Sequence, residues 1–389
     1  MHFNHRSAFF FEMICKDVIY YLESWAPKEI SWERDNVGLQ VGAASRRLKN
    51  ILLSLDLTST VIDEAVNRNC NLIITHHPLL FNPLYKIDTE NDKMSKMIEQ
   101  LVKNNITLYS THTNLDAAKG GVSFQLANKL KLQNLSFLKN LAGNQVKLVV
   151  FVPASHINQV AAAIHKQGGG IIAEYSHCSF RTTGTGTFRG SNPSNPAIGN
   201  KGKIENVEEV KLEVLVDSFK LSKVITEMKN AHPYEEVAYD LYPLKNENTN
   251  YGMGVVGELS TPMMANDFLK YVATSLKIKN LRYNNGTKQR IKKVAVCGGS
   301  GSELIPDALK NQTDAYVTAD IKYHSFQDAE GKLLLIDAGH YETEIYCIDE
   351  IQKRLRKFLI NNPKIKVFKY RGSTNPVIFF NNQGVRKIV

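Results

Sequence analysis

The chain has 389 residues, of which 43% are hydrophobic and 22% are charged. This length suggests two or three domains, and the composition excludes a mostly disordered chain, a collagen-like fibre and a disulfide scaffold. The formal net charge is +10, but the basic residues occur in short, scattered runs. Such runs are typical of solvated helix faces and strand edges, so we do not expect a nucleic-acid partner.

The cysteines favour a reducing, cytoplasmic location, because they are odd in number and form no C-x-x-C pair. No apolar run approaches the length of about 18 residues that a membrane-spanning helix needs, so we expect no membrane association. Residues 1–12 are interpreted as a loose tail or a misassigned start, because Met13 opens an amphipathic helix that extends to Trp25.

Two similar blocks of alternating strands and helices flank a different middle region. In the first block, 13–143, strands are predicted at 50–55, 71–75 and 106–110, and helices at about 58–69 and 91–104 and after Gly121. In the last block, 251–389, strands are predicted at 293–297, 315–318 and 333–336, each followed by a helix. This alternation indicates βαβ units and mainly parallel sheets, an α/β fold class.

The middle region, 144–250, has a different pattern. Strands are expected at 146–152, 210–216 and 237–242, helices at 156–166 and 221–230, and a Gly/Asn/Pro/Ser-rich loop at 184–202. Two βαβ halves within about 100 residues indicate an inserted ferredoxin-like (α+β) domain.

The strongest candidate site is distributed over three strand ends. His76 and His77 end one strand, His112 and Asp116 follow another, and His340 and Glu344 follow a third. The last two pairs are spaced by four residues, about one helical turn, so each pair can face one point. Polar groups at the carboxyl ends of parallel strands are also where α/β folds place their chemistry.

Four imidazoles and two carboxylates form a mixed nitrogen and oxygen ligand set. That set suits Zn, Fe, Mn or Co, and six ligands suffice for two divalent ions. The alternative for any single motif is a turn with hydrogen-bonded imidazoles. Three motifs on matching strand ends favour metal, and two ions would activate a bound water and polarise a substrate.

Five segments together resemble one known family. They are Asp35-Asn-Val-Gly-Leu-Gln-Val-Gly42, Ile74-Thr-His-His-Pro-Leu79, Thr111-His-Thr-Asn-Leu-Asp116, Cys297-Gly-Gly-Ser-Gly301 and Asp337-Ala-Gly-His-Tyr-Glu-Thr-Glu344. They are similar to the NIF-three-like family, often labelled GTP cyclohydrolase one type two homolog. His232-Pro-Tyr-Glu-Glu236 resembles the inserted CutA-like domain of its longer bacterial members.

The resemblance implies a dinuclear metal site at the mouth of a paired α/β domain, in a ring-shaped homohexamer. The ligands it implies are His76, His77, His112, Asp116, His340 and Glu344. The chain also offers Glu342, but we prefer Glu344 because a spacing of four returns to the face of the histidine. The family label implies hydrolytic opening of the GTP imidazole ring, and hence a nucleotide or small anionic ligand.

Several further residues have both a functional and an ordinary interpretation. Asp320 and His324 could orient a ligand or contact substrate, or they are a helix start with a surface histidine. Asn36 and Gly38 could set a loop near the metals, or form a plain turn. The glycines of the glycine-rich motif could present backbone N–H groups to an anion, or form a strand-to-helix turn; they are Gly298, Gly299 and Gly301.

The middle region offers less chemistry. His232 and the segment 234–236 could form a ligand-sensing site, although a turn with surface carboxylates is the plainer interpretation. Cys178 beside His177 lacks a third orienting group, which argues against nucleophilic catalysis there. We therefore expect a metal-dependent hydrolase. The alternative is a metal-binding regulatory or metal-handling protein without turnover, whose inserted domain senses a ligand or partner.

Overall fold

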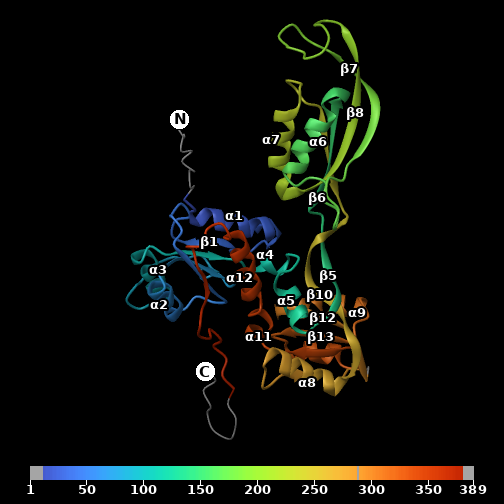
Figure 1. Ribbon diagram of the computed structural model, residues 1–389. Coiled ribbons are helices and arrows are strands. Elements are labelled where there is room, and N and C mark those ends of the chain that lie inside the picture. The colour runs from blue at the N-terminus through green and yellow to red at the C-terminus, as the bar shows by residue number, and fades with distance from the viewer. Residues whose placement is uncertain (1–11, 287–288, 380–389) are drawn as a thin grey trace, which may run out of the picture. The chain divides into compact units, whose positions relative to one another are not determined.

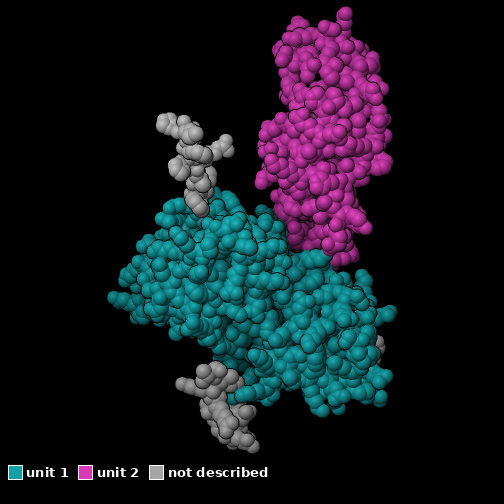
Figure 2. All heavy atoms as spheres, in the orientation of Figure 1, with its two compact units in different colours: residues 1–139, 252–389 teal, residues 140–251 magenta. Residues whose placement is uncertain are grey.

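The computed structural model describes residues 12–286 and 289–379, which form two compact units (Figure 2). Unit 1 combines residues 1–139 with 252–389, and unit 2 comprises residues 140–251. The tail predicted at 1–12 lies outside the described residues, apart from Glu12.

The first sheet of unit 1 has five strands in the order β1-β4-β3-β2-β15. Their bounds are β1 (Gly38–Val41), β2 (Asn50–Ser54), β3 (Cys70–Thr75), β4 (Thr107–Ser110) and β15 (Val367–Lys369). All neighbours pair in parallel except β1, which is antiparallel to β4 at the edge. Every residue of β3 is buried, as expected for the centre of a parallel sheet covered on both faces.

Helices α2 (Ser59–Asn67) and α3 (Lys93–Lys103) lie together on one side of this sheet (Figure 1). The Thr58 hydroxyl caps α2 by accepting a hydrogen bond from the Val61 amide at 3.3 Å, as the sequence predicts. Helices α1 (Cys15–Trp25) and α12 (Cys347–Phe358) contact each other through stacked rings of Tyr21 and Phe358, 4.3 Å apart. Within the described ranges, no helix has the length and apolar character required to cross a bilayer.

The second sheet of unit 1 has six strands in the order β11-β14-β13-β12-β10-β5. Their bounds are β5 (Gln133–Ala142), β10 (Glu247–Met264), β11 (Arg282–Tyr283), β12 (Arg290–Ser300), β13 (Ala315–Ala319) and β14 (Leu334–Asp337). Strands β12, β13 and β14 are parallel, but β10 and β11 pair antiparallel to them. This sheet is therefore mixed and not mainly parallel, because β10 and β11 each run antiparallel to the strand beside them, β12 and β14.

Helices α5 (Val122–Lys129) and α8 (Ala265–Leu276) pack on one face of the second sheet, where Phe268 and Val272 join a buried cluster with Val294 and Val317. Helices α9 (Ile305–Lys310) and α10 (Tyr323–Ala329) follow β12 and β13. After β14 the chain leaves this sheet, forms α12 and adds β15 to the first sheet. The last block therefore contributes to both sheets of unit 1.

Unit 2 has the element order β6-α6-β7-β8-α7-β9, and its four strands form an antiparallel sheet in the order β7-β8-β6-β9. The bounds are β6 (Gln145–Pro153), α6 (Ile157–Lys166), β7 (Phe180–Arg189), β8 (Ile204–Asp217), α7 (Leu221–Ala231) and β9 (Tyr239–Leu244). The two helices contact each other and bury one face of the sheet, including Leu148, Leu212 and Val214.

The loop predicted at 184–202 is too long. Residues 184–189 belong to β7, which pairs with β8 without a break from Phe180 to Arg189. The alternating Thr and Gly residues have a loop-like composition, because glycine disfavours isolated strands. The continuous ladder with β8 outweighs that preference, and only the segment 190–203 connects the two strands.

Candidate metal centre

Parallel pairing brings the first donors together at one edge of the first sheet. Thr75 at the end of β3 is in register with Ser110 at the end of β4. His76 and His77 follow β3 directly, and their amides both donate to the Leu55 carbonyl oxygen. His112 follows β4 and precedes the short helix α4 (Thr113–Asp116), which ends at Asp116.

The second sheet supplies the remaining donors. After β14 the chain turns at Gly339, whose φ of +85° favours glycine, and enters the short helix α11 (His340–Glu344). His340 and Glu344 are the first and last residues of this helix, so they lie on the same face. Glu344 is buried, with 3% of its surface exposed.

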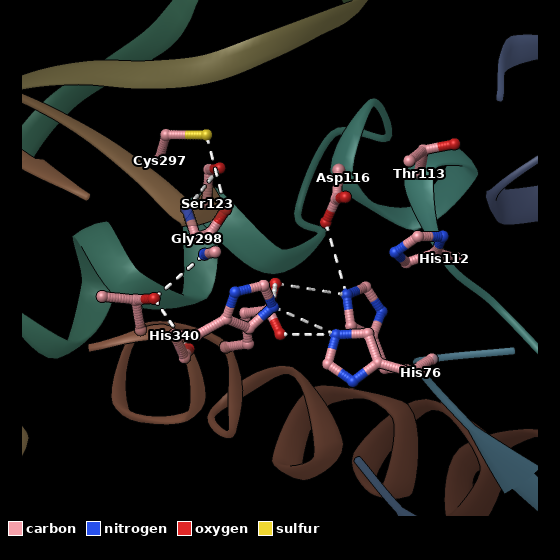
Figure 3. Close-up of polar contacts among 12 residues, drawn as sticks. His76, His112, Thr113, Asp116, Ser123, Cys297, Gly298 and His340 are labelled. Carbon is pink, nitrogen blue, oxygen red and sulfur yellow. Dashed lines mark hydrogen bonds and ion pairs between the residues drawn. The ribbon is translucent and has the colours of Figure 1, made fainter. Parts of the chain in front are cut away.

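The donors of the two sheets meet in one cluster, with His76, Asp116 and His340 pointing toward one another (Figure 3). His77 Nε2 lies 3.3 Å from His340 Nε2 and 3.0 Å from Glu344 Oε2. His76 Nε2 lies 3.7 Å from oxygens of both Asp116 and Glu344. Ligand atoms of two overlapping groups, His76–His77–His112 and His77–His340–Glu344, lie within 4.8 Å of one another.

Three buried polar atoms of this cluster have no hydrogen-bond partner among the described residues. They are both ring nitrogens of His76 and Asp116 Oδ1, and His76 has no exposed surface. Leaving such atoms unsatisfied is costly, typically about 1–3 kcal/mol each. Imidazole nitrogens and carboxylate oxygens are ligands for Zn, Fe, Mn and Co. The unsatisfied donors therefore fit a bound metal ion.

Three carboxylates hold the histidines from outside the cluster. Asp56 Oδ1 lies 2.7 Å from His77 Nδ1, and Asp35 Oδ1 lies 2.8 Å from His112 Nδ1. Asp320 Oδ2 lies 2.6 Å from His340 Nδ1. A carboxylate that accepts the Nδ1 proton leaves Nε2 as the lone-pair atom, which is the usual arrangement around protein-bound metals.

Hydroxyl groups fix two of these carboxylates in turn. The Thr374 hydroxyl donates to Asp56 Oδ2 at 2.6 Å, and the Thr113 amide donates to Asp35 Oδ2 at 3.1 Å. The Thr113 hydroxyl contacts the same Asp35 oxygen. Burial raises the pKa of Asp35, but the contacts with His112 and Thr113 outweigh it and lower the pKa to about 2.

In the absence of metal, the histidines and carboxylates of the cluster shift one another's pKa values. Burial lowers the pKa of His77, but Asp56 and Glu344 outweigh it and raise the pKa to about 10. Burial and the neighbouring Glu344 raise the pKa of Asp116 to about 8. Burial also raises the pKa of Glu344, but His76 and His340 outweigh it and hold that pKa well below its ordinary value.

The glycine-rich motif has a spatial role at the cluster. The amides of Gly298 and Gly299 donate to Ser123 Oγ at 3.2 Å and Thr343 Oγ1 at 2.9 Å, which agrees with the strand-to-helix turn and not with the alternative of an anion site. A Cβ on Gly299 would lie 2.1 Å from Glu344 Oε1, and its φ is +65°. Gly299 therefore leaves the space that the Glu344 carboxylate occupies.

The other predicted residues lie around the cluster or away from it. The Asn36 side chain donates to the Leu80 carbonyl oxygen. His324 is exposed, and its ring contacts Gln327 at 3.5 Å. Glu342 accepts a hydrogen bond from Asn375 at 2.8 Å, whereas Glu344 faces the histidines.

The remaining predicted glycines, Gly38 and Gly301, are also placed outside the cluster. A Cβ on Gly38 would meet the Lys28 side chain, and one on Gly301 would meet the hydroxyls of Tyr316 and Thr318. Both positions are thus constrained by packing against neighbouring side chains.

Sequence reasoning missed Asp35, Asp56 and Thr374. Asp56 follows a predicted buried strand almost directly, so its position at a strand end was a usable signal. Asp35 belongs to the Asp-Asn-x-Gly turn, of which only Asn36 and Gly38 were considered. Thr374 carries no local signal, because its contact with Asp56 joins residues 318 positions apart.

The sequence matches the family model Duf34/NIF3 (NGG1p interacting factor 3) over residues 13–376. The chain belongs to this family. The curated "GTP cyclohydrolase 1 type 2 homolog" of Halalkalibacterium halodurans is 39% identical over 345 residues, which cover 88% of this chain and 92% of that protein. The relative of the same name from Bacillus subtilis is 37% identical over 368 residues, covering 94% of this chain and 98% of that protein.

A solved structure of a Duf34/NIF3 relative is similar along almost the whole chain. The structure of a Bacillus cereus protein related to NIF3 superposes with a TM-score of 0.83 and 39% sequence identity. The superposition covers 95% of this chain and 100% of that one. The family resemblance noted from the five sequence segments is thereby confirmed.

Proposed function

We propose that this Duf34/NIF3 member binds two divalent metal ions and is a metal-dependent hydrolase acting on a nucleotide or a related anionic substrate. The observation that carries the proposal is the convergence of six donor side chains, three of whose buried atoms have no hydrogen-bond partner in the described part of the chain. The names of the two curated relatives support a nucleotide as substrate.

The proposed ligands fall into two overlapping groups. His76, His77 and His112 lie on the side of the first sheet, with Asp116 beside them. His340 and Glu344 come from the second sheet and share His77 with the first group. His77 would offer only Nε2 to a metal ion, because its Nδ1 contacts Asp56, whereas Asp116 and Glu344 would each offer carboxylate oxygens.

The chain's own residues orient the ligands and keep their protonation fixed. Asp35, Asp56 and Asp320 hold the Nδ1 protons of three histidines, so that each Nε2 faces the centre. When bound, two divalent ions supply Lewis acidity and bring the pKa of a coordinated water near neutrality. The zinc, iron, manganese or cobalt alternatives stay open, because this donor set accepts each of them.

The proposal is tested by turnover of purified protein supplied with each metal in turn. GTP, other nucleoside triphosphates and a simple phosphodiester serve as substrates, and products are separated by chromatography. We expect turnover with one substrate class, lost in Asp116→Ala and His340→Ala and kept in His177→Ala, an exposed histidine of unit 2. Full metal occupancy with no turnover of any substrate would contradict the hydrolase proposal.

Three further expectations accompany this function. We propose that unit 2 is a ferredoxin-like domain, supported by its βαββαβ element order and by the strand order β7-β8-β6-β9. We also propose the ring-shaped homohexamer and the cytoplasmic location that the family resemblance implies. Native mass spectrometry of the full chain tests the hexamer directly.

A further inference from the structure

Unit 2 contains a cavity that the proposed metal chemistry does not use. Its volume is about 580 Å³, within the usual range of roughly 300–1,000 Å³ for small-molecule sites. It lies between β7, the segment 190–197 that follows it, and the segment 234–238 before β9. Figure 1 shows β7 and the connection that follows it at the end of unit 2.

The cavity lies on the face of the sheet opposite the helices. Leu212 and Val214 of β8 pack against α6 and α7, so Glu209 and Lys211, at odd positions, point to the other face. Gly184 is paired with Glu209, and Gly186 follows on the same face of β7. A Cβ on Gly184 would meet no atom within 4 Å. The glycines therefore leave the room that the cavity occupies.

A chain of hydrogen bonds fixes one carboxylate in the cavity wall. His232 Nε2 lies 3.0 Å from the Phe151 carbonyl oxygen, and His232 Nδ1 accepts from the Tyr234 amide at 3.1 Å. The Tyr234 hydroxyl then donates to Glu209 Oε1 at 3.0 Å. Glu209 Oε2 lies toward Gly186, where a Cβ would come within 2.1 Å. This carboxylate is therefore held in one orientation.

The charge of the lining is negative. Glu209, Glu235 and Glu236 all line the cavity, and Lys211 is its one lysine among the described residues. The Lys211 ammonium is engaged by Glu213 at 2.7 Å, and Lys147 pairs with the same carboxylate at 3.0 Å. These pairs engage the two lysines of the neighbouring sheet face, Lys147 and Lys211.

The rest of the lining is apolar and aromatic. Phe151, Phe188 and Tyr234 contribute rings, and the Phe188 and Tyr234 ring centroids lie 6.4 Å apart. Glu235 Oε1 accepts a hydrogen bond from the Asn195 amide at 2.7 Å, which closes the segment 190–197 over the site. Aromatic faces attract cations, and a fixed carboxylate binds them by charge-assisted hydrogen bonds.

We propose that this cavity binds a small organic cation, an amine or amidine carried on a flat apolar body. The cationic group donates to Glu209 and the apolar body lies among Phe151, Phe188 and Tyr234. The site goes beyond the proposed hydrolase function and is independent of it, because all its residues belong to unit 2.

The test uses the full-length protein and ligand-observed nuclear magnetic resonance. Benzamidine and tryptamine are the cationic probes, and benzamide and benzoate are the neutral and anionic relatives of benzamidine. We expect benzamidine to bind at least about tenfold more tightly than benzamide, which lacks the positive charge, or benzoate, which is anionic and has no N–H donor for Glu209. Absence of binding by both cationic probes, or equal binding of benzamidine, benzamide and benzoate, overturns the proposal.

Three variants locate the binding. Glu209→Gln keeps an acceptor for Tyr234 but removes the charge, and we expect it to abolish the preference for benzamidine over benzamide. Glu208→Gln is the matched control, because Glu208 is exposed and adjacent on the opposite face of β8. Gly184→Val fills the open space and should weaken both cationic probes. Equal effects of the two glutamine variants, or a Gly184→Val protein that binds like wild type, contradict the site.

The metal content and circular dichroism of each variant are measured alongside, and both should match the wild type. If a second copy of the chain filled the cavity instead, wild type would bind no probe and Gly184→Val would change the mass of the oligomer. That result would also overturn the proposal.

Discussion

The Nε2 atoms of His77 and His340 lie 3.3 Å apart, although 263 residues separate the two histidines. Each ring donates its Nδ1 proton to a carboxylate, Asp56 for His77 and Asp320 for His340. In the neutral imidazoles both Nε2 atoms then carry lone pairs that face each other. Such a contact is stabilised by a positive charge, either a proton shared by the two nitrogens or a metal ion bound to them. This relationship ties the two sheets of unit 1 to one candidate metal centre.

The carboxylates behind the histidines should control metal affinity. We expect Asp56→Asn and Asp35→Asn each to weaken metal binding by about 10–100-fold, as is typical when an outer hydrogen-bond partner of a ligand is removed. The measurement is a competition titration with a chromophoric chelator. Asp63→Asn is the control, because Asp63 is an exposed residue of α2. Equal affinities in all three variants would show that the carboxylates do not orient the ligands.

Thr374 should act on the metal through Asp56. Its hydroxyl donates to Asp56 Oδ2 at 2.6 Å, while Asp56 Oδ1 lies 2.7 Å from His77. We expect Thr374→Val to lower metal affinity less than Asp56→Asn does, and Thr374→Ser to restore it because the hydroxyl returns. The same competition titration decides. If Thr374→Ser bound metal as weakly as Thr374→Val, the loss of affinity would be due to packing and not to the hydroxyl.

Gly299 should be required for the position of Glu344. An alanine Cβ there would lie 2.1 Å from Glu344 Oε1, so we expect Gly299→Ala to displace the carboxylate and lose metal. Gly331→Ala is the matched control, because Gly331 has φ +68° against +65° at Gly299 and no atom within 4 Å of its Cβ. Both variants carry a similar backbone strain of about 1 kcal/mol. Elemental analysis should find metal lost only from Gly299→Ala.

Unit 2 should lose stability as the pH falls below the ordinary pKa of histidine. Burial lowers the pKa of His232 from its ordinary value of 6.5, while Phe151 and Glu209 raise it and His156 lowers it further. Because the folded pKa lies below the unfolded one, the stabilisation is complete above about pH 6.5 and declines as the pH falls toward the folded pKa. Protonation at Nδ1 would also break the bond from the Tyr234 amide.

This pH dependence is measurable by hydrogen-exchange mass spectrometry with intrinsic rates corrected. Peptides of unit 2 should lose protection between about pH 7.5 and about pH 5.5 in wild type, and much less in His232→Gln, which does not titrate. An equal loss of protection in both proteins would assign the pH effect to other groups.

The sequence predicts the site better than it predicts the sheets. Strands with buried, β-branched sequences and polar residues at their ends indicated where His76, His112 and His340 lie, because parallel strands bring such ends to one edge. The spacing of four also favoured Glu344 over Glu342, and in the structure Glu344 faces the histidines while Glu342 faces Asn375. Both signals are patterns of residues close together in the sequence, so they can be recognised without knowing the fold.

Features that depend on distant pairing could not be predicted in this way. The pairing of β15 with β2 and the bond from Thr374 to Asp56 join segments more than 300 residues apart. Strand β7 was read as a loop beyond Thr183, because its glycines disfavour a strand when considered alone. The antiparallel return of β10 depends on where the inserted unit begins and ends, which local periodicity does not specify.

The most direct test of the shared centre is the metal content per chain, by elemental analysis of protein purified without chelator. Wild type is compared with Asp116→Ala from the first block and His340→Ala from the last. We predict about two ions per wild-type chain and loss of metal in both variants, since ligands from both blocks hold the ions. A wild-type protein without metal after reloading, or full metal content in both variants, would contradict a dinuclear centre built by the two blocks.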